Sequence, residues 1–167
     1  MIDLNNLSNN SASHWQFHGS FDFDVPIGAF GFVYKISKIN PLPNEKAFYI
    51  GRKYLTAAKT TSKRVLLKSG TKVTKKKKSR VESDWRVYMG SCQPLLREIE
   101  RLGKEAFKFE ILSFGFTRGQ VNFMECWCQF RSDVLIDDSY FNDAIGSGQF
   151  RGVRFDSDFK KMLRDLN

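Results

Sequence analysis

The chain has 167 residues, a formal net charge of +9 and 14% aromatic residues, 16 of them phenylalanine. A single domain of this length buries roughly 70% of its unfolded surface, so it needs neither a disulfide nor a metal to hold it together. The 41% hydrophobic content excludes global disorder. No apolar run approaches the length of a membrane span, and the polar start lacks a signal-peptide pattern, so we expect a cytoplasmic protein without membrane contact.

Cysteine and histidine are too few to suggest a zinc site. Cys126 and Cys128 form a Cys-x-Cys pair without a second pair of ligands, so we expect free thiols at these positions and at Cys92. His14 and His18 are four residues apart but have no glutamate between them, which disfavours a metal role.

The positive charge is concentrated in one block. Residues 1–34 carry a net charge of −3 and the remainder +12, and residues 59–80 hold ten basic residues and no acidic one. Such a block repels itself, so we predict a loop or a flexible ribbon; a solvated surface without a specific role is the alternative. Its position between two core-like segments favours a contact with a phosphate backbone. The predicted DNA-binding residues are Lys59, Lys63, Arg64, Lys68, Lys72, Lys75, Lys76, Lys77, Lys78 and Arg80.

Residues 31–36 and 46–51 are rich in β-branched and aromatic side chains, and turn-forming residues separate them. This pattern predicts a β-hairpin with a long loop. Residues 83–88 resemble a short helix with Ser83 as its N-cap. A clearer helix follows Ser91 and ends at Gly103.

Residues 107–111 alternate apolar with polar side chains and predict a strand that runs on to Phe114. Residues 120–135 predict a helix whose core-facing stripe comprises Phe123, Trp127, Phe130 and Val134. The expected fold is therefore α/β of the α+β type, with a small three-stranded antiparallel sheet flanked by helices.

Glu125 projects about 200° away from Phe123 around that helix. No cation follows it at the neighbouring positions of the same helix face. The carboxylate could pair with a surface lysine, or hold a hard divalent cation together with phosphate oxygens. Its position alone leaves both open.

Two tyrosines on the predicted hairpin, Tyr34 and Tyr49, are ordinarily core residues with a solvated hydroxyl. Their context, however, Gly31-Phe32-Val33-Tyr34 followed by Tyr49-Ile50-Gly51, resembles the paired signature of the GIY-YIG nucleases. The run Ser-Asp-Trp-x-x-Tyr-x-Gly-Ser at residues 83–91 is similar to the free-standing group of this family in large bacteriophages. The resemblance extends from about Gly31 to Asn142.

This resemblance implies the fold already expected and a set of site residues. Glu125 corresponds to the single metal-binding glutamate, and Asn142 to a later asparagine of the family. Tyr88 stands where many relatives have a histidine, and Asp84 where they have an arginine. Another residue must then supply the catalytic cation; the candidates are Arg52, Lys53 and Arg86, with Lys53 preferred.

The implied function is a Mg²⁺-dependent DNA endonuclease of the phage homing or mobile-element type. Glu125 would hold one Mg²⁺ ion, which stabilises the leaving oxygen. Tyr34, helped by Tyr49 or Tyr88, would take a proton from water; a phenol with a pKa near 10 needs a nearby cation to act as a base. Asn142 would orient a tyrosine or the substrate. The alternative is a non-catalytic nucleic-acid-binding protein in which Glu125 pairs with a lysine.

We expect a flexible segment at residues 1–24, a nuclease domain at 25–145 with the basic block as an insertion at 59–80, and a short extension at 146–167. The expected partner is double-stranded DNA, bound by a monomer in isolation or a dimer on DNA. The sequence leaves open the target site, nicking or double-strand cleavage, and a role in homing, host DNA degradation, restriction or repair.

Overall fold

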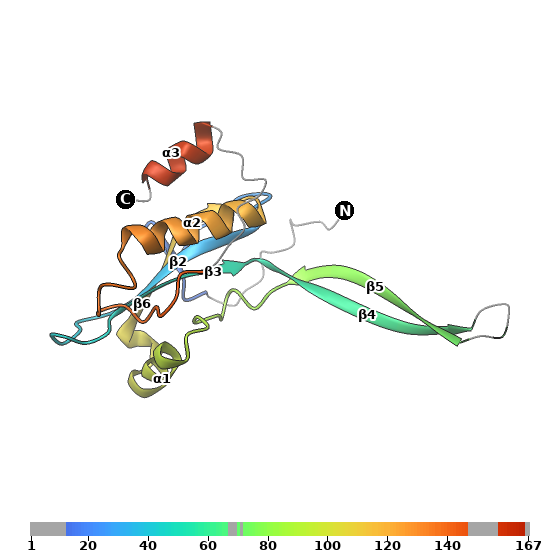
Figure 1. Cartoon of the computed structure of the whole chain (residues 1–167), viewed down its shortest axis with the longest axis horizontal. Coiled ribbons are helices and arrows are strands. Elements are labelled where there is room, and N and C mark those ends of the chain that lie inside the picture. The colour runs from blue at the N-terminus through green and yellow to red at the C-terminus, as the bar shows by residue number, and fades with distance from the viewer. Residues whose placement is uncertain (1–12, 67–69, 71, 147–156, 166–167) are drawn as a thin grey trace.

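The computed structural model describes residues 13–66, 70, 72–146 and 157–165. A four-stranded sheet of order β1-β6-β2-β3 lies between helices, and a separate two-stranded ribbon, β4-β5, extends away from it (Figure 1). The strands are β1 (Gln16–Phe17), β2 (Gly31–Lys38), β3 (Phe48–Tyr54), β4 (Thr56–Leu66), β5 (Lys72–Glu82) and β6 (Phe107–Gly115). The helices are α1 (Gln93–Leu102), the 3₁₀ turn η2 (Lys104–Ala106), α2 (Arg118–Arg131) and α3 (Ser157–Asp165).

The expected three-stranded antiparallel sheet is confirmed as β6, β2 and β3, and a fourth strand is added to it. β2 pairs antiparallel with both β3 and β6, as the hairpin prediction requires. The added strand β1 pairs parallel with β6 over two residues, too short a segment to carry a sequence pattern. Trp15, just before β1, is fully buried and donates a hydrogen bond from Nε1 to the Trp85 carbonyl at 2.8 Å. The described part of the segment 1–24 therefore contributes to the core.

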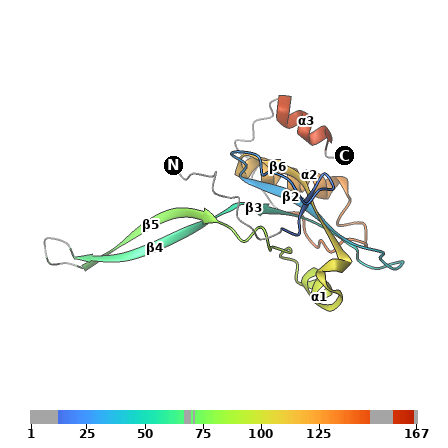
Figure 2. The ribbon, with the colours of Figure 1, turned by 180° about the vertical axis from the view of Figure 1, so that it is seen from behind.

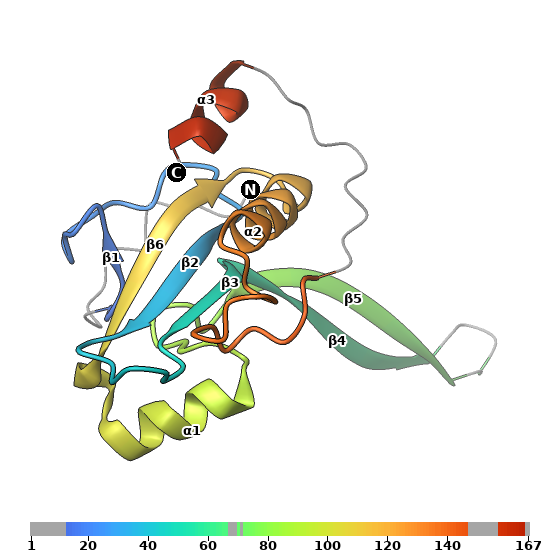
Figure 3. The ribbon, with the colours of Figure 1, turned by 60° about the vertical axis from the view of Figure 1, so that its left-hand side comes forward.

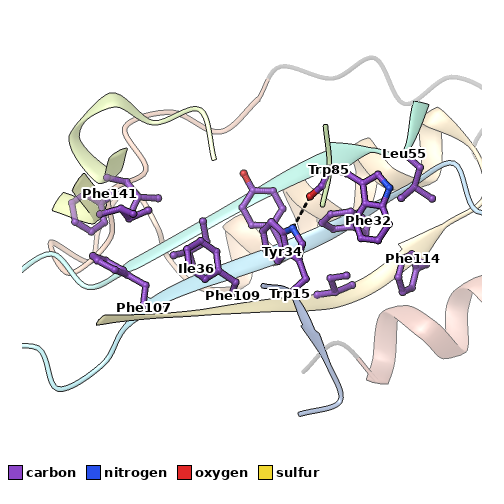
Figure 4. Close-up of a cluster of buried hydrophobic side chains, with 13 residues drawn as sticks. Trp15, Phe32, Tyr34, Ile36, Leu55, Trp85, Phe107, Phe109, Phe114 and Phe141 are labelled. Atoms are coloured by element: carbon purple, nitrogen blue, oxygen red, sulfur yellow. Dashed lines mark hydrogen bonds between the residues drawn. The ribbon is translucent and has the colours of Figure 1, made fainter. Parts of the chain in front are cut away.

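The side chains of β2 alternate between two clusters on opposite faces of the sheet. Phe32, Tyr34 and Ile36 belong to the cluster that includes α1, and most of this cluster is drawn in Figure 4. Val33 belongs to the cluster that includes α2 and α3. Figure 3 shows α1 and α2 on opposite sides of the sheet, with α3 beyond α2. The central strand is thus covered on both faces.

The helix after Ser91 is confirmed as α1, which buries Leu95 and Ile99 and ends at Gly103 with φ 84°. The short helix predicted at residues 83–88 is wrong, because this segment forms a single turn closed by a hydrogen bond from the Val87 amide to the Asp84 carbonyl. Burial of the Trp85 side chain beside Phe32 holds this turn against the core.

The α2 helix is confirmed, but its predicted core stripe is wrong in part. Val121, Met124 and Cys128 are its buried apolar residues against the sheet. Phe123 and Trp127 are half-buried, and the Phe123 ring centroid lies 6.1 Å from that of Phe159 in α3. Phe130 is 66% exposed, while Val134 is buried beyond the helix end. The sheet therefore contacts the face of α2 that carries Val121, Met124 and Cys128, next to the predicted stripe, and α3 contacts Phe123.

The basic block, predicted as a loop or a flexible ribbon, is a regular two-stranded ribbon. It forms the β4-β5 hairpin, paired without interruption from Thr56 opposite Glu82 to Leu66 opposite Lys72. Threonine, serine and valine recur among the lysines, and their preference for strands competes with charge repulsion. Figure 2 shows the hairpin extending beyond the rest of the fold. Lys68 lies outside the described residues.

Within the part of the chain that the structure describes, no helix is both long and apolar enough to cross a membrane. The three cysteines are free thiols, as expected.

Candidate active site

Three phenols meet on the α1 side of the sheet. Tyr34 is only 1% exposed, and its ring contacts those of Tyr49 and Tyr88. Its ring centroid lies 6.1 Å from the centroid of each of these two rings. The register between β2 and β6 shifts between Val33 and Tyr34, and such bulges redirect side chains beside active sites. The sequence prediction that Tyr34, Tyr49 and Tyr88 act together therefore corresponds to a real cluster.

Gly51 makes room for this cluster. It lies opposite Tyr34 in the β2-β3 pair, and a Cβ atom at Gly51 would stand 2.6 Å from the Tyr34 hydroxyl oxygen and 2.9 Å from Tyr49 Cε1. Both distances are far below van der Waals contact. The last glycine of the Tyr-Ile-Gly motif is thus required by the packing of the phenols.

Burial is the main influence on the pKa values of Tyr34 and Tyr49. Removal from water raises the pKa of Tyr34 well above its ordinary value, and the neighbouring Tyr88 and Tyr49 raise it further. Burial likewise raises the pKa of Tyr49, against a hydrogen bond with Ser91 that lowers it. That a nearby cation enables one of these tyrosines to act as a base stays a prediction. Tyr34 is protonated at neutral pH.

Glu125 lies on the other face of the sheet, where α2 packs on β3. Its side chain is buried and accepts a hydrogen bond at Oε2 from Nη1 of Arg52, with which it forms an ion pair. Successive residues of a strand point to opposite faces, so Arg52 points toward α2 while Gly51 lies on the phenol side. The predicted acid and one of the three candidate cations thus meet across two elements. Spacing along the α2 helix could not reveal this partner.

The other two candidate cations have different partners. The Lys53 ammonium lies 2.5 Å from Asp84 Oδ1 and 3.7 Å from the Tyr88 ring centroid. The Lys53 salt bridge lowers the pKa of Asp84. Lys53 therefore stands beside the phenol cluster, as expected. Arg86 pairs with Glu82 and lies over the Trp85 ring.

Asn142 forms hydrogen bonds with the backbone of β3, the edge strand of the sheet. Its Oδ1 accepts from the Ile50 amide at 3.0 Å, and its Nδ2 donates to the Ile50 carbonyl at 2.8 Å. This backbone clamp lies between Tyr49 and Gly51, and the expected contact of Asn142 with a tyrosine or the substrate stays a prediction. Gln129, which the sequence analysis missed, donates to the same carbonyl at 3.1 Å. Its position one helical turn after Glu125 was the available signal.

The exposed edge of β3 is covered along only part of its length. Residues 139–141 run beside it, with hydrogen bonds from the Phe48 amide to the Ser139 carbonyl and from the Phe141 amide to the Phe48 carbonyl. With the Asn142 clamp at Ile50, this cover reaches up to Gly51. The phenols and the Arg52–Glu125 pair are therefore on opposite faces of one strand, at the point where its edge becomes open.

The donor set at Glu125 suits a single hard cation. Mg²⁺ commonly takes one or two carboxylates, with water and substrate phosphates completing its shell. Beside the pair, a Cβ at Gly146 would lie 3.8 Å from Glu125 Oε2, so the neighbouring backbone comes close without crowding it. Among the described residues, no three His, Cys, Asp or Glu side chains cluster as a metal site. Glu125 would supply the one carboxylate of such a site; Arg52 holds its Oε2.

A cleft of about 650 Å³ opens beside these residues, where β3 leads into the hairpin. Arg52, Lys53 and Asp84 line it, together with residues that the sequence analysis missed or assigned only to the basic block. Its further charged and aromatic walls are Phe30, Tyr54, Arg80 and Arg118. The cleft thus has a strongly positive lining next to the buried acid.

A mixed α and β fold with a phenol cluster, a buried acid and a cationic cleft on one edge strand is suited to cleaving a polyanion. A family model described as "Putative endonuclease segE, GIY-YIG domain" matches residues 15–145. The chain therefore belongs to the GIY-YIG endonucleases, hydrolases of DNA phosphodiester bonds. Within this family, the matching model is the segE domain. Neither the curated proteins nor the solved structures gave a match.

Proposed function

We propose that this endonuclease is Mg²⁺-dependent and cleaves double-stranded DNA at the edge of β3, with Glu125 as its metal ligand. The observation that carries this proposal is the buried Glu125 carboxylate, held by Arg52 next to Gly51 and the phenols. A buried acid paired with a partly exposed cation is a group whose partner can be exchanged. Bound Mg²⁺ would supply a Lewis acid for the phosphate oxygens.

The chain's own residues divide the remaining work. Arg52, once released from Glu125, provides a guanidinium for the phosphate, whose two-pronged geometry it matches. Tyr34 stays neutral because its pKa is raised, so its one hydroxyl proton can be donated to Tyr49 or to Tyr88 and orient that side chain. Tyr88, with the Lys53 ammonium 3.7 Å from its ring centroid, is the candidate to accept a proton from water. Asn142 is a positioning residue that holds the β3 backbone.

The resemblance to the free-standing phage group favours a homing or mobile-element role, exercised in the cytoplasm of a host cell. The β4-β5 hairpin supports DNA as the partner, since it carries nine described cations and the contact needs no base-specific side chain. We propose that the protein is a monomer in isolation and pairs only on DNA.

The test is cleavage of supercoiled plasmid by Glu125→Gln with Mg²⁺ and with EDTA. The wild-type protein should nick the plasmid only with Mg²⁺, and the variant should lose activity by a factor of about 1000 while binding DNA as before, since an amide of the same shape cannot replace the carboxylate charge.

Glu100→Gln is the matched control, because it makes the same change on the exposed face of α1 and should leave cleavage unaltered. Full Mg²⁺-dependent cleavage by Glu125→Gln would remove Glu125 from the mechanism. Cleavage that persists in EDTA would contradict the Mg²⁺ requirement.

A further inference from the structure

The cleft at the foot of the hairpin contains two arginines that no other charge neutralises. Four cations and one acid, Asp84, line it. Arg52 and Lys53 are paired with Glu125 and Asp84. Among the described residues, Arg80 and Arg118 take part in no ion pair, and both are exposed. Two unpaired guanidiniums at one concave site constitute an anion-binding arrangement.

Aromatic rings support both guanidiniums. The Arg80 guanidinium carbon lies 4.7 Å from the Phe30 ring centroid, and its Nε donates to Thr56 Oγ1 at 2.9 Å. The Arg118 guanidinium carbon lies 5.4 Å from the centroid of Tyr54. Tyr54 in turn donates from its hydroxyl to Asn122 Oδ1 at 2.6 Å. These supports restrict the two long side chains before any ligand arrives, which lowers the entropy cost of binding.

The same contacts select the chemistry of the ligand. A guanidinium over an aromatic ring keeps N–H groups available for two-pronged hydrogen bonds to phosphate oxygens. The Tyr54 ring lies near two guanidiniums, those of Arg52 at 5.9 Å and Arg118 at 5.4 Å, so it supports cations and is not a free platform for a base. The cleft therefore favours a backbone phosphate over a stacked nucleobase.

We propose that Arg80 and Arg118 bind a DNA backbone phosphate that flanks the scissile phosphate, and that the cleft is a separate phosphate subsite. This inference rests on the proposed function, because the cleft shares Arg52 and Lys53 with the candidate active site. Arg80 is also the last cation of β5 before the cleft, so the subsite joins the cationic hairpin to the reaction centre. It fixes the position of the strand without reading its sequence.

The experiment measures affinity for a short fluorescent DNA duplex in EDTA across a salt series, for Arg80→Gln, Arg118→Gln and the double variant. Each single variant should weaken binding several-fold, and the double variant should reduce the slope of log affinity against log salt by about 0.9, the value for one lost phosphate contact. Arg118→Lys should keep the salt slope but recover only part of the affinity, because it retains the charge without the guanidinium fork.

Arg97→Gln on α1 is the matched control, because Arg97 is exposed, contributes the same charge and does not line the cleft. An unchanged slope in the double variant would overturn the subsite, and so would an equal loss in Arg97→Gln, which would reveal only a general charge effect. Because the assay contains no Mg²⁺ and measures no cleavage, its result is independent of whether Glu125→Gln abolishes activity.

Discussion

Gly51 is the residue that decides how closely the phenols approach one another. The Tyr34 hydroxyl occupies the space that a side chain at position 51 would fill. Gly146, beside the Arg52–Glu125 pair, is less constrained, because a Cβ there would have its nearest neighbour at 3.5 Å, an ordinary contact. The two glycines therefore differ in what a methyl group would do.

We predict that Gly51→Ala lowers the free energy of unfolding by about 1–3 kcal/mol, the usual cost of overpacking a well-filled site. Displacement of Tyr34 and Tyr49 should also reduce cleavage on the order of 100-fold, as a misplacement near 1 Å does. Denaturant unfolding and plasmid nicking measure the two effects. Gly146→Ala should change stability much less, and equal losses in both variants would contradict the steric explanation.

The raised pKa of Tyr34 predicts alkaline destabilisation. In the unfolded chain this phenol ionises near its ordinary pKa of about 10, whereas in the folded protein it keeps its proton to higher pH. The contribution to stability is therefore complete below about pH 10 and is lost as the pH rises through the folded pKa.

Tyr34→Phe should flatten the fall of unfolding free energy above about pH 10, measured by denaturant titration at several pH values. A residual slope is expected, because burial also raises the pKa of Tyr49. An identical alkaline slope in the variant and the wild-type protein would show that Tyr34 is not protected from ionisation.

At the scale of elements, the β4-β5 hairpin is a cationic arm. Each of its strands has eleven residues, so the arm extends over roughly 35 Å. Lys63 lies directly opposite Lys75, a like-charge pair that disfavours the hairpin until an anion neutralises it. A two-stranded ribbon fits the major groove of DNA in width. DNA should accordingly stabilise the distal part of the arm.

Replacing residues 60–78 by Asn-Gly tests this arm. Lys59 and Ser79 are paired across the hairpin, so a two-residue turn between them preserves the register. We expect the core to fold normally, with DNA affinity and salt dependence both strongly reduced, since the deletion removes eight cations. Circular dichroism and the salt series measure these outcomes. Unchanged salt dependence would exclude the distal hairpin from DNA binding.

For the molecule as a whole, the sheet separates two cores that differ in composition. The α1 side is rich in aromatic rings around Trp15 and holds the phenols. The α2 side holds Glu125 at the end of an apolar cluster that α3 completes with Phe159 and Leu163. The edge strand β3 contributes side chains to both cores. A change in the packing of either core should therefore displace β3 and the candidate active-site residues on it.

Phe159→Ala should destabilise the protein by about 3–5 kcal/mol, because this ring is only 1% exposed and its removal leaves a cavity beside α2. Phe130→Ala removes the same side chain from a position that is 66% exposed and should cost far less. Thermal or denaturant unfolding compares the two. Equal costs would restore the predicted stripe in which Phe130 faces the core.

The central hairpin, α1, β6 and α2 could be predicted from the sequence, because alternation and helical periodicity express burial within one element. The grouping of Tyr34, Tyr49, Tyr88, Glu125 and Asn142 as a site came from the order of family motifs. The regular pairing of the basic block was missed because charge repulsion along one strand says nothing about the partner strand. The short turn at residues 83–88 was missed because its burial depends on Trp85 reaching a distant core.

By itself, the sequence determined the elements, the family signature and the concentration of charge, since each is a property of neighbouring residues. Only the tertiary structure decided that Arg52 is the partner of Glu125, that Asn142 clamps Ile50, and that Arg80 and Arg118 share a cleft. These contacts join residues tens of positions apart. Their energies depend on distance and burial, which local spacing along the chain does not encode.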